Sequence, residues 1–198
     1  MPCSKYSFYK RGMSYVELIV VLSIFATLSS VVIFNHGDFQ DRVDIKNLAS
    51  DIALKIIEAQ KSSVNGVMPP LGHTPDDPDN WKPAYGVYFD ITSNDKQFVY
   101  FTDLDKDNTY SFGGELLDTI DITKNNFISN IDTCSVDPCA LGSESTNLLS
   151  ITFTRLNSGA SFDGATLTGS DYIQIAISSP KGATALVKVY PSGRVRVN

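Results

Sequence analysis

An uncharged apolar stretch near the N-terminus constrains this chain more than any other feature. Residues 18–34 contain only aliphatic, aromatic, alanine, serine and threonine side chains. Counted from Met13, the stretch would form roughly 33 Å of helix at about 1.5 Å per residue, which matches the hydrocarbon thickness of a bilayer. The sequence therefore predicts a membrane-spanning helix.

The charges on the two sides of this stretch predict its orientation. Lys5, Lys10 and Arg11 precede it, and residues 1–12 contain no acidic side chain, whereas Asp38 and Asp41 follow it. Basic flanks stay on the cytoplasmic side. We therefore expect a single-pass protein with a cytoplasmic N-terminus and an exported C-terminal part.

One carboxylate, Glu17, lies at the edge of the apolar stretch. An ionised carboxylate in hydrocarbon is costly unless it has a partner. A secretory signal peptide would have a shorter apolar core and a small-residue cleavage site after it, and a plain signal anchor gives no reason for the carboxylate. A plain anchor and a lone, protonated Glu17 both stay open as alternatives.

The residues around Glu17 form a more specific pattern. Residues 10–12 are Lys-Arg-Gly, and residues 13–18 are Met-Ser-Tyr-Val-Glu-Leu. This pattern resembles the class III leader of type IV pilins and pseudopilins, although Met13 and Ser14 stand where that family more often has phenylalanine and threonine. The resemblance implies that a prepilin peptidase cuts between Gly12 and Met13 and leaves N-methylmethionine at Met13. It also implies that Glu17 neutralises the N-terminal amine of a neighbouring subunit during filament assembly.

Composition fits one globular domain after the leader and the anchor. The chain has 198 residues, of which 42% are hydrophobic and 19% charged. Without the anchor about 150 residues remain, which is enough for a domain with its own core. The net charge is −6, and residues 1–12 carry three positive charges and no negative one, so the mature chain would carry −9. Such a charge disfavours binding of polyanions through the overall field.

Hydrophobic periodicity predicts a helix and then strands. Apolar residues at positions 45, 48, 52, 56 and 59 form one face of an amphipathic helix, which Gly66, Pro69 and Pro70 end. Alternating segments predict strands at residues 85–89, 97–102, 116–122, 126–131, 148–154, 172–178, 185–190 and 194–197. One helix before a strand-rich part indicates the α+β class.

The order of the C-terminal segments resembles the soluble domain of GspH/FimT-type minor pseudopilins. The segments that carry this resemblance are residues 84–89, the Asp-rich turn that ends at Glu115, and residues 153–160, 172–175 and 189–195. The resemblance implies an α+β, pilin-like fold in which a long N-terminal helix, half transmembrane and half amphipathic, packs on a C-terminal antiparallel sheet domain. The expected divisions are a cleaved leader at 1–12, a transmembrane or filament-core helix at 13–35, an amphipathic helix at 36–63, and a GspH/FimT-like domain at 64–198.

Two cysteines remain after the leader, which itself contains Cys3. Cys134 and Cys139 close a short loop, and export would place them in an oxidising compartment. A disulfide between them is expected. A structural zinc site would need further Cys or His ligands.

An acidic segment offers a candidate cation site. Asp103, Asp105 and Asp107 alternate along the chain and Glu115 follows, which suits a cation with oxygen ligands such as Ca²⁺. However, Asn108 occupies the position that an EF-hand loop reserves for glycine, and Glu115 falls one residue late. An ordinary solvated turn of Asp, Asn and Gly residues is the alternative. Apart from this calcium site, no cofactor is expected.

Arg194 and Arg196 form a second candidate site. On a strand they would project from one face and contact successive phosphates, and the Gly-Arg-x-Arg tail is similar to that of FimT-like minor pilins that take up DNA. Two such contacts give weak, salt-sensitive binding to DNA. The net negative charge of the chain acts against this binding. Arginines paired across strands, or exposed at a sheet edge, are the alternative.

No enzyme is expected from this sequence. The chain has only His36 and His73, neither near a nucleophile motif, and it has no Gly-rich phosphate loop. The resemblance implies a minor pseudopilin of the bacterial inner membrane, a structural subunit of a type II secretion pseudopilus or a type IV pilus. Its implied partners are other pilin subunits, the prepilin peptidase and secreted cargo. A FimT-like pilin that binds DNA for uptake, and an anchored envelope protein with no filament role, are the competing hypotheses.

Overall fold

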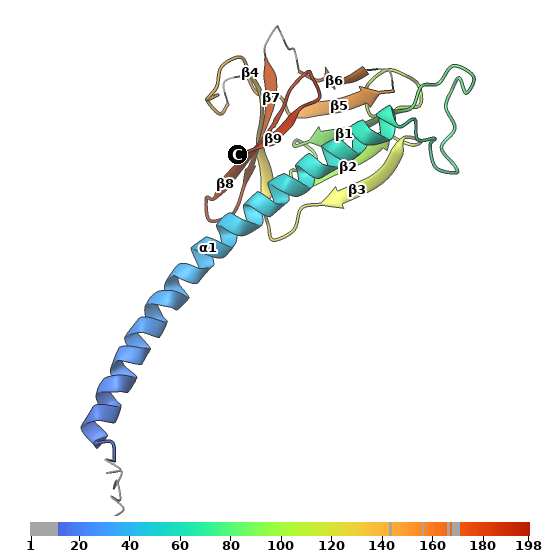
Figure 1. Ribbon diagram of the computed structural model, residues 1–198. Helices are drawn as coiled ribbons and strands as arrows, with labels where there is room; N and C mark the ends of the chain where they lie inside the picture. The colour runs from blue at the N-terminus through green and yellow to red at the C-terminus, as the bar shows by residue number, and fades with distance from the viewer. Residues whose placement is uncertain (1–11, 143, 156, 166, 168–170) are drawn as a thin grey trace, which may run out of the picture. The chain divides into compact units, whose positions relative to one another are not determined.

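The computed structural model describes residues 12–142, 144–155, 157–165, 167 and 171–198. The chain divides into two compact units, of which the first ends at Gln40 and the second is Asp41–Asn198. A single helix, α1 (Tyr15–Val64), contributes residues to both units (Figure 1).

The described part of the first unit is dominated by the N-terminal part of α1. The amide of Leu18 donates to the carbonyl of Ser14 at 3.1 Å, which closes the first helical bond. The hydroxyls of Ser23 and Thr27 donate to carbonyls of the preceding turn at 2.8 Å, so these two polar side chains are satisfied within the helix. The large apolar side chains of this part are exposed, namely Tyr15, Val16, Leu18, Ile19, Val20, Val21, Leu22, Ile24, Phe25, Leu28 and Val31.

Within the described residues, no helix combines the length and the apolar character that crossing a bilayer requires. The expected transmembrane half of the N-terminal helix is therefore wrong, and so is the expected location as a single-pass inner-membrane protein. α1 does not end where the apolar stretch ends. It continues through the charged residues Asp41, Arg42, Asp44 and Lys46.

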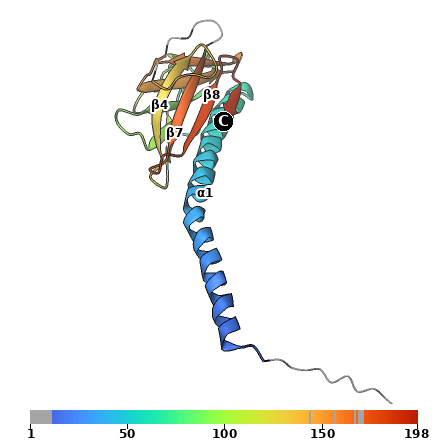
Figure 2. The same ribbon diagram turned by 90° about the vertical axis from the view of Figure 1, so that its left-hand side faces the viewer.

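The second unit contains nine strands in its described part, and these form two antiparallel sheets (Figures 1 and 2). The five-stranded sheet has the order β3-β2-β1-β5-β6, and the four-stranded sheet has the order β4-β7-β8-β9. The strands are β1 (Ala84–Asp90), β2 (Gln97–Thr102), β3 (Leu116–Asp121), β4 (Phe127–Cys134), β5 (Leu148–Thr154), β6 (Asn157–Asp163), β7 (Tyr172–Ser178), β8 (Thr184–Val189) and β9 (Val195–Val197).

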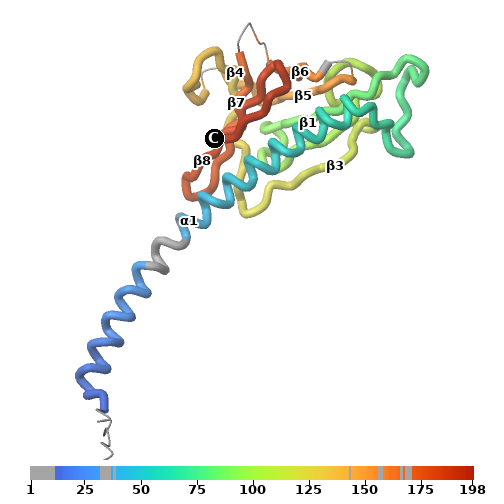
Figure 3. Tube along the Cα trace, in the orientation of Figure 1, coloured from blue at the N-terminus to red at the C-terminus, as the bar shows by residue number. Residues whose placement is uncertain are grey.

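The expected pilin-like fold class also needs correction in its sheet part. One antiparallel sheet domain was expected, whereas the chain builds two sheets and alternates between them, as its trace shows (Figure 3). It leaves the five-stranded sheet after β3, returns to it for β5 and β6, and leaves it again for β7. Local alternation of apolar residues predicts strands but carries no information about which sheet each strand joins, which is why the prediction failed here.

One hydrophobic core joins both sheets to the C-terminal part of α1. Ile45, Ile52 and Ile56 are almost completely buried on one face of the helix. Alanines on the same face keep the helix close to the sheets. The core residues around them include Ala49, Ala53 and Ala59 of α1, Phe89, Phe98 and Phe153 of the five-stranded sheet, and Ile175, Ile177 and Val187 of the four-stranded sheet.

Candidate functional site

The residues predicted for processing and assembly lie at the start of α1. Gly12 and Met13 lie just before the helix, from which Ser14 separates them, and Met13 is 69% exposed. Glu17 lies in the first helical turn and is exposed. A carboxylate in this turn is stabilised by the positive end of the helix dipole. The rest of the leader, residues 1–11, lies outside the described residues, so cleavage and methylation stay predictions.

The acidic segment forms a loop that Asp103 holds from one side. Asp103 is 1% exposed. One of its carboxylate oxygens accepts from the backbone amide of Lys106 at 2.7 Å, and the other accepts from the amide of Asn108 at 3.1 Å. Lys106 and Asn108 both have positive φ, at 70° and 64°. Asn adopts this conformation more readily than most residues, so the segment turns sharply around the buried carboxylate.

Glu115 holds the same loop from the other side. Its two carboxylate oxygens accept from the backbone amides of Leu104 at 2.8 Å and Ser111 at 2.7 Å. Glu115 is only 4% exposed. Two buried carboxylates therefore hold this loop in shape by accepting hydrogen bonds from its backbone amides.

Three of the four predicted calcium ligands come together. One carboxylate oxygen each from Asp103, Asp105 and Glu115 lie within 4.8 Å of one another, and carboxylate oxygens are the ligands that Ca²⁺ prefers. Asp107 is outside this group, and its carboxylate accepts from the amide of Thr109 at 2.7 Å. The backbone donors account for the shape of the loop without a cation. Calcium binding therefore stays a prediction.

Burial raises the pKa of Asp103 to about 6. The amides that donate to this carboxylate lower the pKa, whereas the neighbouring charges of Glu115 and Asp105 raise it further. Burial also raises the pKa of Glu115. The loop thus holds two carboxyl groups that bind protons more tightly than exposed carboxyls do.

The contribution of Asp103 to stability is expected to fall as the pH rises from about 4 to about 6. The pKa of this carboxyl is 3.8 in the unfolded chain and about 6 in the folded one, so the folded state binds more protons between these two pH values. The free energy of unfolding therefore falls by ~3 kcal/mol as the pH rises across this interval. Urea unfolding at several pH values measures this slope. Asp103→Asn should reduce this slope, and an equal slope in wild type and Asp103→Asn would contradict the assignment.

Arg194 and Arg196 lie at an edge of the four-stranded sheet. Arg194 immediately precedes the edge strand β9, and its guanidinium lies 4.0 Å from the ring centroid of Tyr190. Arg196 lies on β9, opposite Lys188 of β8. Both arginines are exposed, and neither forms an ion pair within the described part of the chain. Exposure at a sheet edge, one of the two alternatives left open by the sequence, is what is found.

The nearest basic neighbour of these arginines in sequence is not available to a phosphate. Lys188 is 3% exposed, and its ammonium contacts the carboxylate of Asp137 at 2.5 Å. Asp137 lies in the short loop closed by the disulfide between Cys134 and Cys139. The disulfide loop therefore covers Lys188, and binding of DNA by Arg194 and Arg196 stays a prediction.

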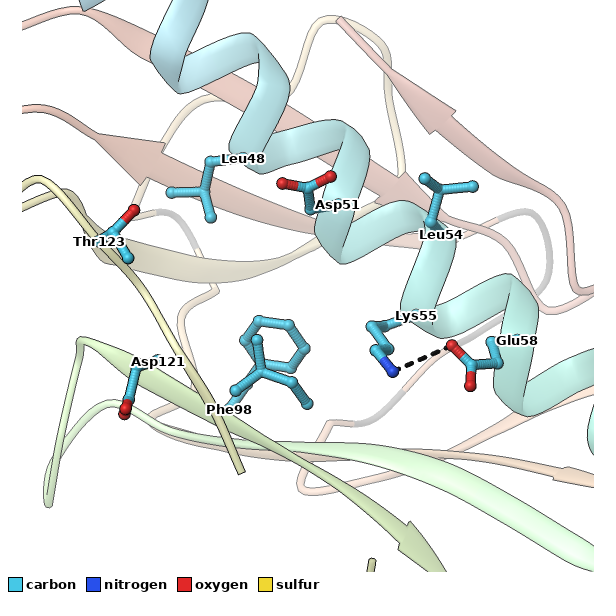
Figure 4. Close-up of a pocket in the computed structure, with 9 residues that line it drawn as sticks. Leu48, Asp51, Leu54, Lys55, Glu58, Phe98, Asp121 and Thr123 are labelled. Carbon is cyan, nitrogen blue, oxygen red and sulfur yellow. Dashed lines mark ion pairs between the residues drawn. The ribbon is translucent and has the colours of Figure 1, made fainter. Parts of the chain in front are cut away.

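A groove that no sequence motif indicated lies between α1 and the edge strand β3 in the second unit. It encloses about 420 Å³. Figure 4 shows α1 residues, among them Leu48 and Leu54, along one side and residues of the sheet and its following loop along the other. The only sequence signal was Leu54, an apolar residue off the predicted helix stripe, and it is 61% exposed.

Comparison of the chain with protein-family models, with curated proteins and with solved structures finds no match in any of the three.

Proposed function

We propose that this chain is a minor pseudopilin or minor type IV pilin, a structural subunit of a helical filament that is matured by cleavage between Gly12 and Met13. The observation that carries the proposal is the place of Glu17. It lies in the first turn of α1, directly after the expected cleavage point and directly before an exposed apolar helical surface.

The exposed apolar surface supports assembly rather than an isolated chain. Contiguous apolar surface of this extent is typical of a site that another molecule covers. Each aliphatic or aromatic side chain that a neighbouring subunit covers completely would contribute about 1.5–3 kcal/mol. The side chains of Leu22, Phe25 and Leu28 alone therefore provide a large driving force for helix packing.

Glu17 supplies the specificity that apolar packing lacks. Packed helices can slide along one another with little change in buried area, whereas a carboxylate in a dry interface must meet a cation. Cleavage after Gly12 creates such a cation, the α-amine of Met13. In this mechanism Glu17 of one subunit accepts from that amine of the next, and the pair selects a single axial register.

The strand-rich second unit carries no proposed catalytic role. Its surfaces contact neighbouring subunits or secreted cargo. The C-terminal part of α1 shares one hydrophobic core with both sheets of this unit.

Intact-mass measurement of the chain isolated from cells with a prepilin peptidase tests the proposal. The mature protein should lack residues 1–12 and carry one additional methyl group. Gly12→Val should retain the full mass. Gly114→Ala is a matched control, since a methyl group at Gly114 meets no atom within 4 Å and should leave cleavage unchanged. A wild-type chain of full mass would overturn the proposal.

A further inference from the structure

The groove between α1 and β3 has an apolar floor and an acidic rim. Phe98 and Ile120 lie on the sheet side, and Leu48 and Leu54 lie on the helix side. The carboxylates around them belong to Asp51, Glu58 and Asp121, and the single cation is Lys55. The groove therefore suits an occupant with apolar length and positive charge.

The cation inside the groove does not neutralise this rim. The ammonium of Lys55 contacts Glu58 at 3.1 Å and also lies 5.3 Å from the ring centroid of Tyr100. Asp51 and Asp121 form no ion pair with any other described residue. Two carboxylates therefore remain to receive an external cation.

The same chain displays a matching pair of cations. Arg194 and Arg196 are exposed and unpaired among the described residues, and the ring of Tyr190 supports the guanidinium of Arg194. Arginine side chains carry a three-carbon apolar stem below a planar head that binds carboxylates with two hydrogen bonds. The apolar part of an arginine side chain can pack on the apolar floor of the groove, and its guanidinium can pair with the carboxylates of the rim.

The two surfaces lie on different flanks of the second unit. In Figure 1, β3 lies on one side of α1 and β9 lies on the other. One copy cannot bring its own edge strand across the helix into its own groove. The complementary charges can therefore meet only between molecules.

We propose that Arg194 and Arg196 of one copy insert into the acidic groove of a second copy and contact Asp51 and Asp121 there. The contact joins two different surfaces, so each copy keeps one free groove and one free arginine pair. Contacts of this kind continue into rings or open chains rather than closing as a two-fold dimer. The inference goes beyond the proposed filament function and does not depend on cleavage at Gly12.

A photo-crosslinker placed at position 54 tests the contact in the full chain. It should form a crosslink between two copies that mass spectrometry maps to residues 194–197, and about tenfold less crosslink is expected in Arg194→Glu/Arg196→Glu or at high salt. Lys82→Glu/Lys96→Glu changes the net charge equally at two exposed lysines and should leave the crosslink intact. Adding Asp51→Arg/Asp121→Arg to the arginine variant should restore it.

Restoration of the crosslink by the added arginines shows that its loss in the arginine variant is due to charge and not to poor folding. A crosslink that survives reversal of both arginines, or one that maps to another segment, overturns the proposal. Titration with double-stranded DNA is run in parallel. Loss of DNA binding in the arginine variant, with the crosslink between copies unchanged, would assign the two arginines to nucleic acid instead. The mass measurement on cleavage reports on the filament proposal independently of either result.

Discussion

Replacing Glu17 with glutamine should abolish incorporation of the chain into filaments while leaving cleavage after Gly12 unchanged. The substitution keeps the size and the hydrogen-bonding capacity of the side chain but removes its charge. The α-amine of Met13 in the neighbouring subunit would then enter a dry interface without a partner, which costs about 3–5 kcal/mol per pair. A loss of this size at every successive subunit reduces assembly to background.

The measurement is the amount of the chain in sheared filaments relative to total cleaved protein. Asp79→Asn is the matched control, because it removes a charge from an exposed aspartate of the second unit and should assemble normally. Normal assembly of Glu17→Gln, with correct cleavage, would show that the carboxylate has no pairing role. It would favour the alternative of a Glu17 that is merely tolerated.

Replacing Ile52 with aspartate should unfold the second unit. Ile52 is completely buried where α1 meets both sheets. An unpaired carboxylate at that position costs several kcal/mol in addition to the roughly 2–5 kcal/mol lost with the isoleucine side chain. Small domains are stable by only about 5–15 kcal/mol in total, so the sum removes most or all of the stability.

Thermal unfolding followed by circular dichroism measures this effect. Asn47→Asp places the same carboxylate on the exposed face of the same helix and should change the melting temperature little. A cooperative, near-native transition in Ile52→Asp would mean that this face of α1 does not carry the core.

Much of the secondary structure could be predicted because it rests on local periodicity. The strand expected at residues 97–102 is β2 with the same bounds, and it pairs antiparallel with β1. β6 was missed, since Asn157–Asp163 contains one large apolar residue, Phe162, among small and polar ones. On the helix, Ala49 and Ala53 are buried although the predicted stripe did not include them.

Among the candidate sites, those whose residues lie close together in the sequence could be predicted, and the one whose residues lie far apart could not. The disulfide between Cys134 and Cys139 depends on two cysteines near in sequence, so spacing was enough to predict it. The grouping of Asp103 and Asp105 with Glu115 was likewise visible in one short segment. The acidic groove was not, because Asp51 lies on α1 and Asp121 ends β3, and only tertiary folding brings these two elements together.

The way the chain alternates between the two sheets has a consequence for biosynthesis. β4 is made long before β7, β8 and β9, the partners that complete its sheet. The apolar residues of β4 stay uncovered until β7 has been synthesised, and pairing over such separations is slow. The nascent polypeptide should therefore depend on a holding chaperone more than its modest length suggests.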